Sequence, residues 1–92
     1  MTYTLRRIGD NAGDSGQMSL AIFPERKTGS QPDVEHDARP QVGACMRVGS
    51  IYARSYYMQD WWQTTPIIEI LEDTPERVVF KTGNSVYEWK CI

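Results

Sequence analysis

One histidine and a group of carboxylates are the residues of this sequence that most suggest chemistry. His36 stands between Glu35 and Asp37, and carboxylates on both sides can equip an imidazole as a general acid or base. A catalytic base must also be held rigidly within hydrogen-bonding reach of its target, and His36 lies in the most polar stretch of the chain. We therefore expect His36 to be solvated and the protein to have no catalytic residue.

Metal binding is the second chemistry to consider. Four carboxylates close together in sequence, as in nucleases, could bind a divalent ion: Glu69, Glu72, Asp73 and Glu76. Their spacing is also that of the solvated side and turn of a β-hairpin, which is the simpler interpretation. Zinc needs more ligands than Cys45, Cys91 and one histidine supply, and two distant cysteines in a cytosolic chain indicate free, buried thiols. The sequence predicts no metal, no cofactor and no disulfide.

Aromatic residues gather in the segment SYYMQDWWQTTP, residues 55–66. Asp60 and Gln63 have the spacing of a capping box, which predicts one helical turn before Pro66. Adjacent tryptophans on such a turn cannot both face one core, so we expect one of Trp61 and Trp62 to be buried and the other exposed.

An exposed tryptophan in this segment has three interpretations. With Arg54, Tyr56 and Tyr57 it has the composition of a protein–protein hot spot. The same composition suits a platform on which nucleic-acid bases stack, or aromatic residues that cap the open end of a small sheet. The weak basic balance of the chain favours a protein partner over nucleic acid.

Basic residues form a second candidate contact. Residues 24–41 hold three prolines and one aliphatic residue, Val34, so burial contributes little to ordering them. The segment is predicted to be a long exposed loop, with at most a turn or two of helix over residues 32–39. If Arg26, Lys27 and Arg39 cluster there, they can meet a phosphate backbone or an acidic patch.

The remaining elements are β-strands. Residues 2–8 and 17–23 are predicted to pair across a glycine-rich loop at 9–16, and residues 42–58 to form a bent strand or two. Residues 67–73, 77–82 and 85–92 alternate clearly, with Gly83-Asn84 as a tight turn containing a positive φ. The fold is predicted to be mainly β: a small, twisted antiparallel sheet or partial barrel with a C-terminal three-stranded meander.

Length and charge limit the possibilities further. The 92 residues suffice for one domain, 1–92, with a net charge of −2 that fits neither phosphate binding by a basic field nor DNA mimicry by a dense acidic one. The chain has no apolar run long enough for a membrane span or a secretory signal, so we expect a cytosolic protein without a membrane or small-molecule partner.

The tail, from DWWQTTPIIEI to VVFKTGNSVYEWKCI, resembles small β-rich proteins of phages and other mobile elements. In these, a Thr-Pro-Ile strand precedes a Thr-x-Asn-Ser-x-Tyr hairpin. The size of the chain and its lack of an enzymatic signature are similar to those of phage anti-CRISPR proteins that inhibit type I-F surveillance complexes.

The resemblance implies a non-enzymatic inhibitor acting in the host bacterial cytoplasm. Its partners would be the Cas proteins, or the Cas proteins together with the crRNA, of a type I complex, with target DNA binding or nuclease recruitment blocked sterically. A module that binds single-stranded nucleic acid through a Tyr/Trp/Arg surface is the alternative. A minor phage structural or regulatory protein follows it, and an enzyme comes last.

Overall fold

The computed structural model describes residues 1–50 and 61–92, apart from the side chains of residues 27 and 28. The described residues form nine strands: β1 (Tyr3–Arg7), β2 (Gly13–Gly16), β3 (Met18–Thr28), β4 (Gln31–His36), β5 (Cys45–Gly49), β6 (Trp61–Gln63), β7 (Ile67–Asp73), β8 (Arg77–Thr82) and β9 (Val86–Cys91). These residues contain no helix, hence none long and apolar enough to cross a membrane. The predicted mainly β fold is confirmed.

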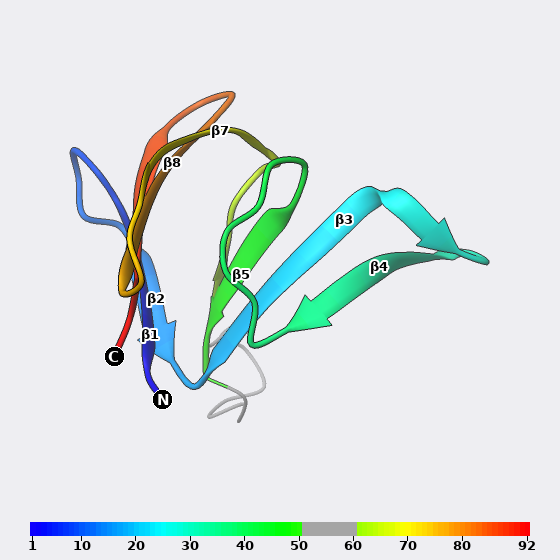
Figure 1. Ribbon diagram of the computed structural model, residues 1–92, viewed down its shortest axis with the longest axis horizontal. Helices are drawn as coiled ribbons and strands as arrows, with labels where there is room; N and C mark the ends of the chain where they lie inside the picture. The colour runs from blue at the N-terminus through cyan, green and yellow to red at the C-terminus, as the bar shows by residue number, and fades with distance from the viewer. Residues whose placement is uncertain (51–60) are drawn as a thin grey trace.

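The strands form two antiparallel sheets (Figure 1). Sheet A has the order β2-β1-β9-β8-β7, and sheet B has the order β4-β3-β5-β6. The last three strands of the chain are neighbours in sheet A, so the predicted C-terminal meander is confirmed.

Two stretches of chain pass from one sheet to the other. β2 of sheet A leads through Gln17 into β3 of sheet B, and β6 of sheet B leads through residues 64–66 into β7 of sheet A. At the second corner the Thr64 N–H donates to the carbonyl of Met46 at 2.9 Å, and the Ile67 N–H donates to that of Ala44 at 3.0 Å. The chain thus stays hydrogen-bonded to the β5 segment as it turns from sheet B into sheet A. The two sheets of the described chain together form an open, barrel-like arrangement that does not close.

The core lies between the inner faces of the two sheets. Trp89 of sheet A is 1% exposed, and its indole N–H donates to the Ser19 hydroxyl of sheet B at 3.0 Å. The Ser19 hydroxyl donates onward to the carbonyl of Ala38 at 2.8 Å, so these buried polar groups are satisfied. Since Ser19 faces inward, period two places its neighbours Met18 and Leu20 on the outer face of sheet B.

The predicted pairing of residues 2–8 with residues 17–23 is wrong. β1 pairs with β2 on one side and β9 on the other, while β3 lies in sheet B between β4 and β5. The sequence Gly13-Asp14-Ser15-Gly16 has low β propensity, so its strand conformation depends on backbone pairing with β1. For this reason the sequence pattern alone predicts a loop here.

The predicted loop at 24–41 is largely a β-hairpin. β3 continues to Thr28, β4 covers Gln31–His36, and Gly29 makes the turn with a φ of 65°. β5 pairs with β3 only over residues 18–22, so the hairpin beyond residue 22 extends past its neighbours. We call residues 23–34 the β3–β4 arm, and Figure 1 shows it projecting from the two-sheet body. The helical turn predicted at 32–39 is absent.

The turn between β8 and β9 differs from the prediction in its backbone. The Thr82 hydroxyl accepts hydrogen bonds from the N–H groups of Asn84 and Ser85 at 3.3 and 3.2 Å. Neither Gly83 nor Asn84 has a positive φ, so the predicted left-handed turn is wrong. The side chain of Thr82, rather than glycine at a special φ, organises this connection.

Cys45 and Cys91 are both free thiols, as predicted, but Cys91 is half-buried rather than buried. Cys45 is buried, and burial raises the pKa of its thiol. A thiol held in its neutral form is a poor nucleophile, in agreement with a structural role for Cys45.

Candidate binding surface

The outer face of sheet B is the most distinctive surface of the described chain. Strand registers and period-two alternation place ten residues on it: Val34 and His36 from β4, Met18, Leu20 and Ile22 from β3, Cys45, Arg47 and Gly49 from β5, and Trp61 and Gln63 from β6. Cys45 and Gly49 are buried, and the other eight are half-buried or exposed. None of the large aliphatic residues here packs against the hydrophobic core. The face thus leaves apolar side chains in contact with solvent.

Trp61 and Arg47 form an aromatic and cationic centre on this face. The Arg47 guanidinium lies 4.1 Å from the centroid of the Trp61 ring system. Its Nε and Nη2 donate to Oε1 of Gln63 at 2.9 and 2.6 Å, because Arg47 and Gln63 are register partners. Trp61 is paired with Gly49, which has no side chain to compete for the space. The stacking and hydrogen bonds hold the cation in place.

The charge of this face differs from that of the whole chain. The protein has 12 acidic and 10 basic residues, yet none of the ten described residues on the outer face of sheet B is acidic. Its ionisable side chains besides Cys45 are Arg47 and His36, which lie on opposite sides of Leu20 in one row across the strands. Such a face suits an apolar partner surface that carries carboxylates or phosphates.

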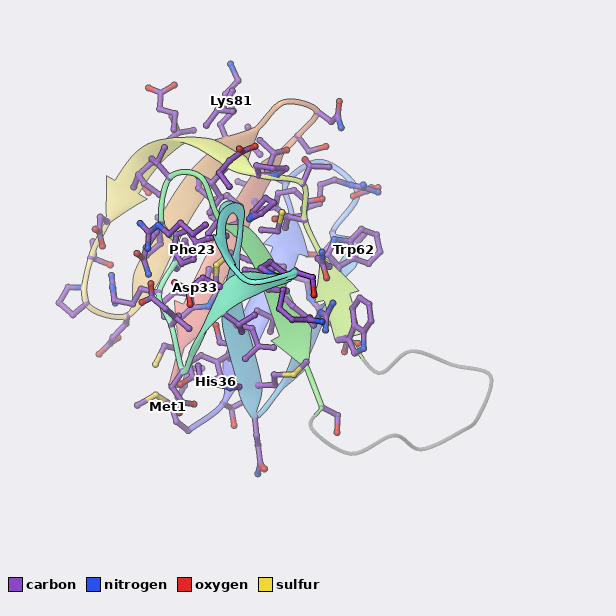
Figure 2. All side chains as sticks on the ribbon, turned by 90° about the vertical axis from the view of Figure 1, so that its right-hand side faces the viewer. Met1, Phe23, Asp33, His36, Trp62 and Lys81 are labelled. Carbon is purple, nitrogen blue, oxygen red and sulfur yellow. The ribbon has the colours of Figure 1, made fainter. Side chains whose placement is uncertain are left out.

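Trp62 points the opposite way. β6 is an extended strand instead of the predicted helical turn, and neighbouring residues of a strand face opposite sides. Trp62 packs against the core, its indole N–H donates to the Tyr87 hydroxyl at 3.4 Å, and the Arg7 guanidinium lies 5.3 Å from its ring centroid. Both tryptophans are half-buried, so the prediction that one is buried and the other exposed is wrong, and it is Trp62, labelled in Figure 2, that packs against the core.

Arg7, which rests on Trp62, is fixed by Asp10. Its Nε donates to Oδ1 of Asp10 at 3.0 Å and its Nη2 donates to Oδ2 at 2.6 Å. This ion pair lowers the pKa of the Asp10 carboxyl to about 2. The Arg7 guanidinium therefore contacts Asp10 and Trp62 within the fold, and we do not include Arg7 in the candidate surface.

The lowered pKa of Asp10 gives a pH prediction. Because the folded-state pKa is below the unfolded value, the stabilisation from this pair is complete above the unfolded pKa of roughly 4 and is lost as the pH falls through about 2. A carboxyl-carbon NMR titration should find Asp10 still largely ionised at a pH where exposed aspartates are half protonated. A midpoint near 4 would contradict the bidentate pair.

The arm carries the first of the predicted basic contacts. The Arg26 guanidinium lies 3.9 Å from the centroid of the Phe23 ring and 3.7 Å from a carboxylate oxygen of Glu35, and its side chain is 59% exposed. Lys27 is paired through its backbone with Pro32, and its side chain lies outside the described residues. Phe23 and Asp33, labelled in Figure 2, are paired at the base of the arm.

Arg39 does not belong to the arm. Its Nη1 donates to the carbonyl of Pro75 at 2.8 Å, and its Nη2 donates to the carbonyl of Thr74 at 2.6 Å and to Asp73. The guanidinium also lies 5.4 Å from the Trp89 ring centroid. Arg39 thus ties the segment after β4 to the β7–β8 turn, and the condition that Arg39 clusters with Arg26 on one loop is not met.

The different contacts of Arg39 and Arg26 predict different contributions to stability. Arg39→Ala should lower the free energy of unfolding by about 1–2 kcal/mol, because two backbone carbonyls and a carboxylate lose a shared donor. Arg26→Ala should cost less than about 1 kcal/mol, since its ion pair is exposed and long and its remaining contact is with the Phe23 ring. Urea denaturation of both variants measures the difference. Equal midpoints would show that the Arg39 contacts contribute nothing.

The other predicted site residues can be placed briefly. Arg54, Tyr56 and Tyr57 lie outside the described residues. Of the four clustered carboxylates, Glu72 pairs with Arg77 and Asp73 with Arg39, while Glu69 and Glu76 are exposed. Within residues 1–50 and 61–92, no three metal-ligating side chains of the His, Cys, Asp or Glu type come together.

An open pocket of about 380 Å³ lies between the chain ends and the β7–β8 turn, away from the outer face of sheet B. Its lining is Met1, Pro75, Glu76, Cys91 and Ile92. Cys91 contacts the Met1 sulfur there, and the lining holds one carboxylate side chain, Glu76, and no imidazole.

Sequence reasoning missed the central member of the surface. The sequence pattern does not single out Arg47, and it predicts Gln63 as part of a helix cap. The alternation of Met18, Leu20 and Ile22 was visible, but which face it occupied depended on pairing with β5, which sequence alone does not specify.

Comparison with known proteins adds no identification: no protein-family model, curated protein or solved structure matches this chain.

Proposed function

We propose that the protein is a non-enzymatic binding protein that occupies a surface of a macromolecular partner through the outer face of sheet B. The observation that carries the proposal is the combination, among the described residues of one face, of half-buried aliphatic side chains outside the core, a preorganised Trp61–Arg47 pair and no carboxylate. Aromatic and arginine side chains supply much of the binding energy of protein interfaces, while charge complementarity sets orientation. The β3–β4 arm adds a projecting element that can enter a groove.

The target we propose is a type I-F CRISPR surveillance complex in the bacterial cytoplasm. Support for this target comes from the resemblance of the C-terminal hairpin to small phage proteins and from the small size of the chain. A ribonucleoprotein of Cas subunits and crRNA offers grooves for the arm and anionic surfaces for Arg47 and Arg26. Steric blockage fits this chain better than DNA mimicry, because its carboxylates are dispersed among a similar number of basic residues.

The non-enzymatic part of the proposal rests on the surroundings of the candidate acid–base residue. His36 is exposed on the outer face of sheet B, beside Leu20, and is not enclosed in a cleft that would exclude water. Rigid enclosure of the reacting groups is what a general base normally requires.

Single-stranded nucleic acid is the second candidate partner, because an indole beside a guanidinium can stack a base and contact its phosphate. Trp61 is the one aromatic residue on the described outer face, whereas aliphatic residues dominate it. Aliphatic surface favours a protein partner, since successive bases need successive aromatic platforms.

The test is direct binding of the purified protein to a purified type I-F surveillance complex and, separately, to single-stranded DNA and RNA oligonucleotides. We expect a stable complex with the ribonucleoprotein and at most weak, strongly salt-dependent binding to oligonucleotides. Tight binding to oligonucleotides alone would replace the proposed function by the second one. No binding to either would remove the proposed target.

A further inference from the structure

Four arginines of the described chain lie over an aromatic ring, and Arg47 differs from the other three in its partner. The other three also pair with a carboxylate: Arg7 with Asp10, Arg26 with Glu35 and Arg39 with Asp73. Arg47, over Trp61, is hydrogen-bonded to the neutral amide of Gln63. No carboxylate of residues 1–50 or 61–92 forms an ion pair with Arg47. Its positive charge is therefore not matched within the described fold.

The hydrogen bonds to Gln63 use one edge of the Arg47 guanidinium. A guanidinium presents its N–H groups in pairs, and each pair can donate to both oxygens of a carboxylate. Oε1 of Gln63 accepts from Nε and Nη2, which form the side edge of the group. The end edge, formed by Nη1 and the second N–H of Nη2, points away from Gln63. Because Trp61 and Gln63 together fix the guanidinium plane, the end edge is oriented for two parallel hydrogen bonds.

Apolar side chains lie in the rows on both sides of Arg47. The strand registers place Arg47 in one row with Leu20 and His36. The neighbouring rows supply large apolar residues: Ile22 and Val34 on one side, Met18 and Trp61 on the other. Rows on one face of a sheet are about 7 Å apart, which is the spacing of alternate residues in a strand. An anion that meets the end edge of Arg47 is thus flanked by apolar surface, which excludes water and strengthens the attraction.

We propose that Arg47, Gln63 and Trp61 form a subsite for a single carboxylate of a protein partner, an Asp or Glu side chain with apolar residues on both sides. The inference rests on the proposed function, because it names the group that the outer face of sheet B contacts. Nucleic acid presents successive phosphates, which need successive cations, whereas Arg47 is the one guanidinium among the described residues of this face. The net charge of −2 on the whole chain also disfavours a polyanion.

The experiment uses end-blocked peptides, so that it does not depend on the identity of the target. The extended peptide Leu-Thr-Glu-Thr-Leu presents one glutamate between two leucines at the spacing of about 7 Å that separates the rows. Titration into isotope-labelled protein should shift the Arg47 Nε–H and the Trp61 indole N–H resonances, with saturation at millimolar concentration. The same peptide with glutamine in place of glutamate should bind at least about tenfold more weakly, because a charge-assisted pair of hydrogen bonds is lost.

Gln63→Glu is the most informative variant. It replaces the amide by a carboxylate of the same shape and gives Arg47 an internal ion pair of the kind that Arg7 forms with Asp10. Affinity for the glutamate peptide should fall at least about tenfold, while the fold is kept because Gln63 is exposed. Arg47→Lys should weaken binding similarly although it retains the charge, since an ammonium has no paired N–H edge.

Arg7→Lys is the matched control. Arg7 lies over Trp62, the neighbour of Trp61 in β6, but its guanidinium is already paired with Asp10. This variant should bind the glutamate peptide as the wild type does. No preference of the wild type for the glutamate over the glutamine peptide, or wild-type affinity in Gln63→Glu, would overturn the proposal. A single-stranded uridine oligonucleotide that shifts the same resonances at lower concentration would assign the end edge to phosphate instead.

The subsite and the proposed target fail separately. A wild-type protein that prefers the glutamate peptide and does not bind the surveillance complex retains the subsite and loses the target. A protein that binds the surveillance complex equally well with and without Gln63→Glu, and shows no preference between the peptides, retains the target and loses the subsite.

Discussion

Gly16→Ala is expected to lower the free energy of unfolding by about 3 kcal/mol or more. A Cβ at Gly16 would lie 2.1 Å from the carbonyl oxygen and 2.2 Å from the carbonyl carbon of Gly49. Both atoms belong to the backbone of β5, so no side-chain rotation relieves the clash. Relief requires β2 and β5 to separate, and Gly16 is where the chain leaves sheet A for sheet B.

Gly83→Ala is the matched control for this substitution. A Cβ at Gly83 meets no atom within 4 Å, and the residue has no positive φ, so the change should alter stability by less than about 0.5 kcal/mol. Thermal and urea unfolding of the two variants provide the comparison. If the Gly16 variant unfolded at the wild-type midpoint, the close approach of the two sheets at Gly49 would be refuted.

Trp61→Ala is expected to weaken partner binding at least about 30-fold, or about 2 kcal/mol, as truncation of an interface aromatic typically does. The substitution removes the largest side chain of the outer face of sheet B and releases the Arg47 guanidinium from the ring at 4.1 Å. Since Trp61 is not part of the core, its loss should change the unfolding free energy by less than about 1 kcal/mol.

Trp62→Ala is the control, because it removes the same side chain from the next residue of the same strand. Trp62 packs on the core and bonds Tyr87, so this variant should lose about 1–3 kcal/mol of stability and keep its affinity where it is still folded. Affinity should be measured by titration calorimetry well below the unfolding transition. A pattern in which Trp62→Ala lost affinity and Trp61→Ala kept it would place the interface on the other side of β6.

The C-terminal half of the fold was predictable because its strands combine alternation with burial. Tyr87 and Trp89 share a face and are both buried, and Val78 and Phe80 lie across from them as buried partners. The arm was not predictable by the same means. The described side chains of residues 24–33 bury almost nothing, so this strand conformation depends on hairpin backbone pairing that leaves no hydrophobic signature.

The candidate surface was predictable only in part. Aromatic density pointed to Trp61, and extended geometry rather than a helical turn explains why Trp61 and Trp62 face apart. The role of Arg47 needed the register that sets it beside Gln63 and Trp61, and the role of Arg39 needed contact with a turn 34 residues along the chain. Long-range register is the information that a local pattern lacks.

Titration of the protein against a fixed amount of purified type I-F surveillance complex, with target DNA capture as the readout, tests the proposed mode of action most directly. Stoichiometric occupation of a surface predicts that DNA capture falls in proportion to added protein and reaches its minimum near saturation of the binding sites. Complete inhibition at a ratio of about one protein to ten or more complexes would contradict it, because only turnover lets one molecule inactivate many.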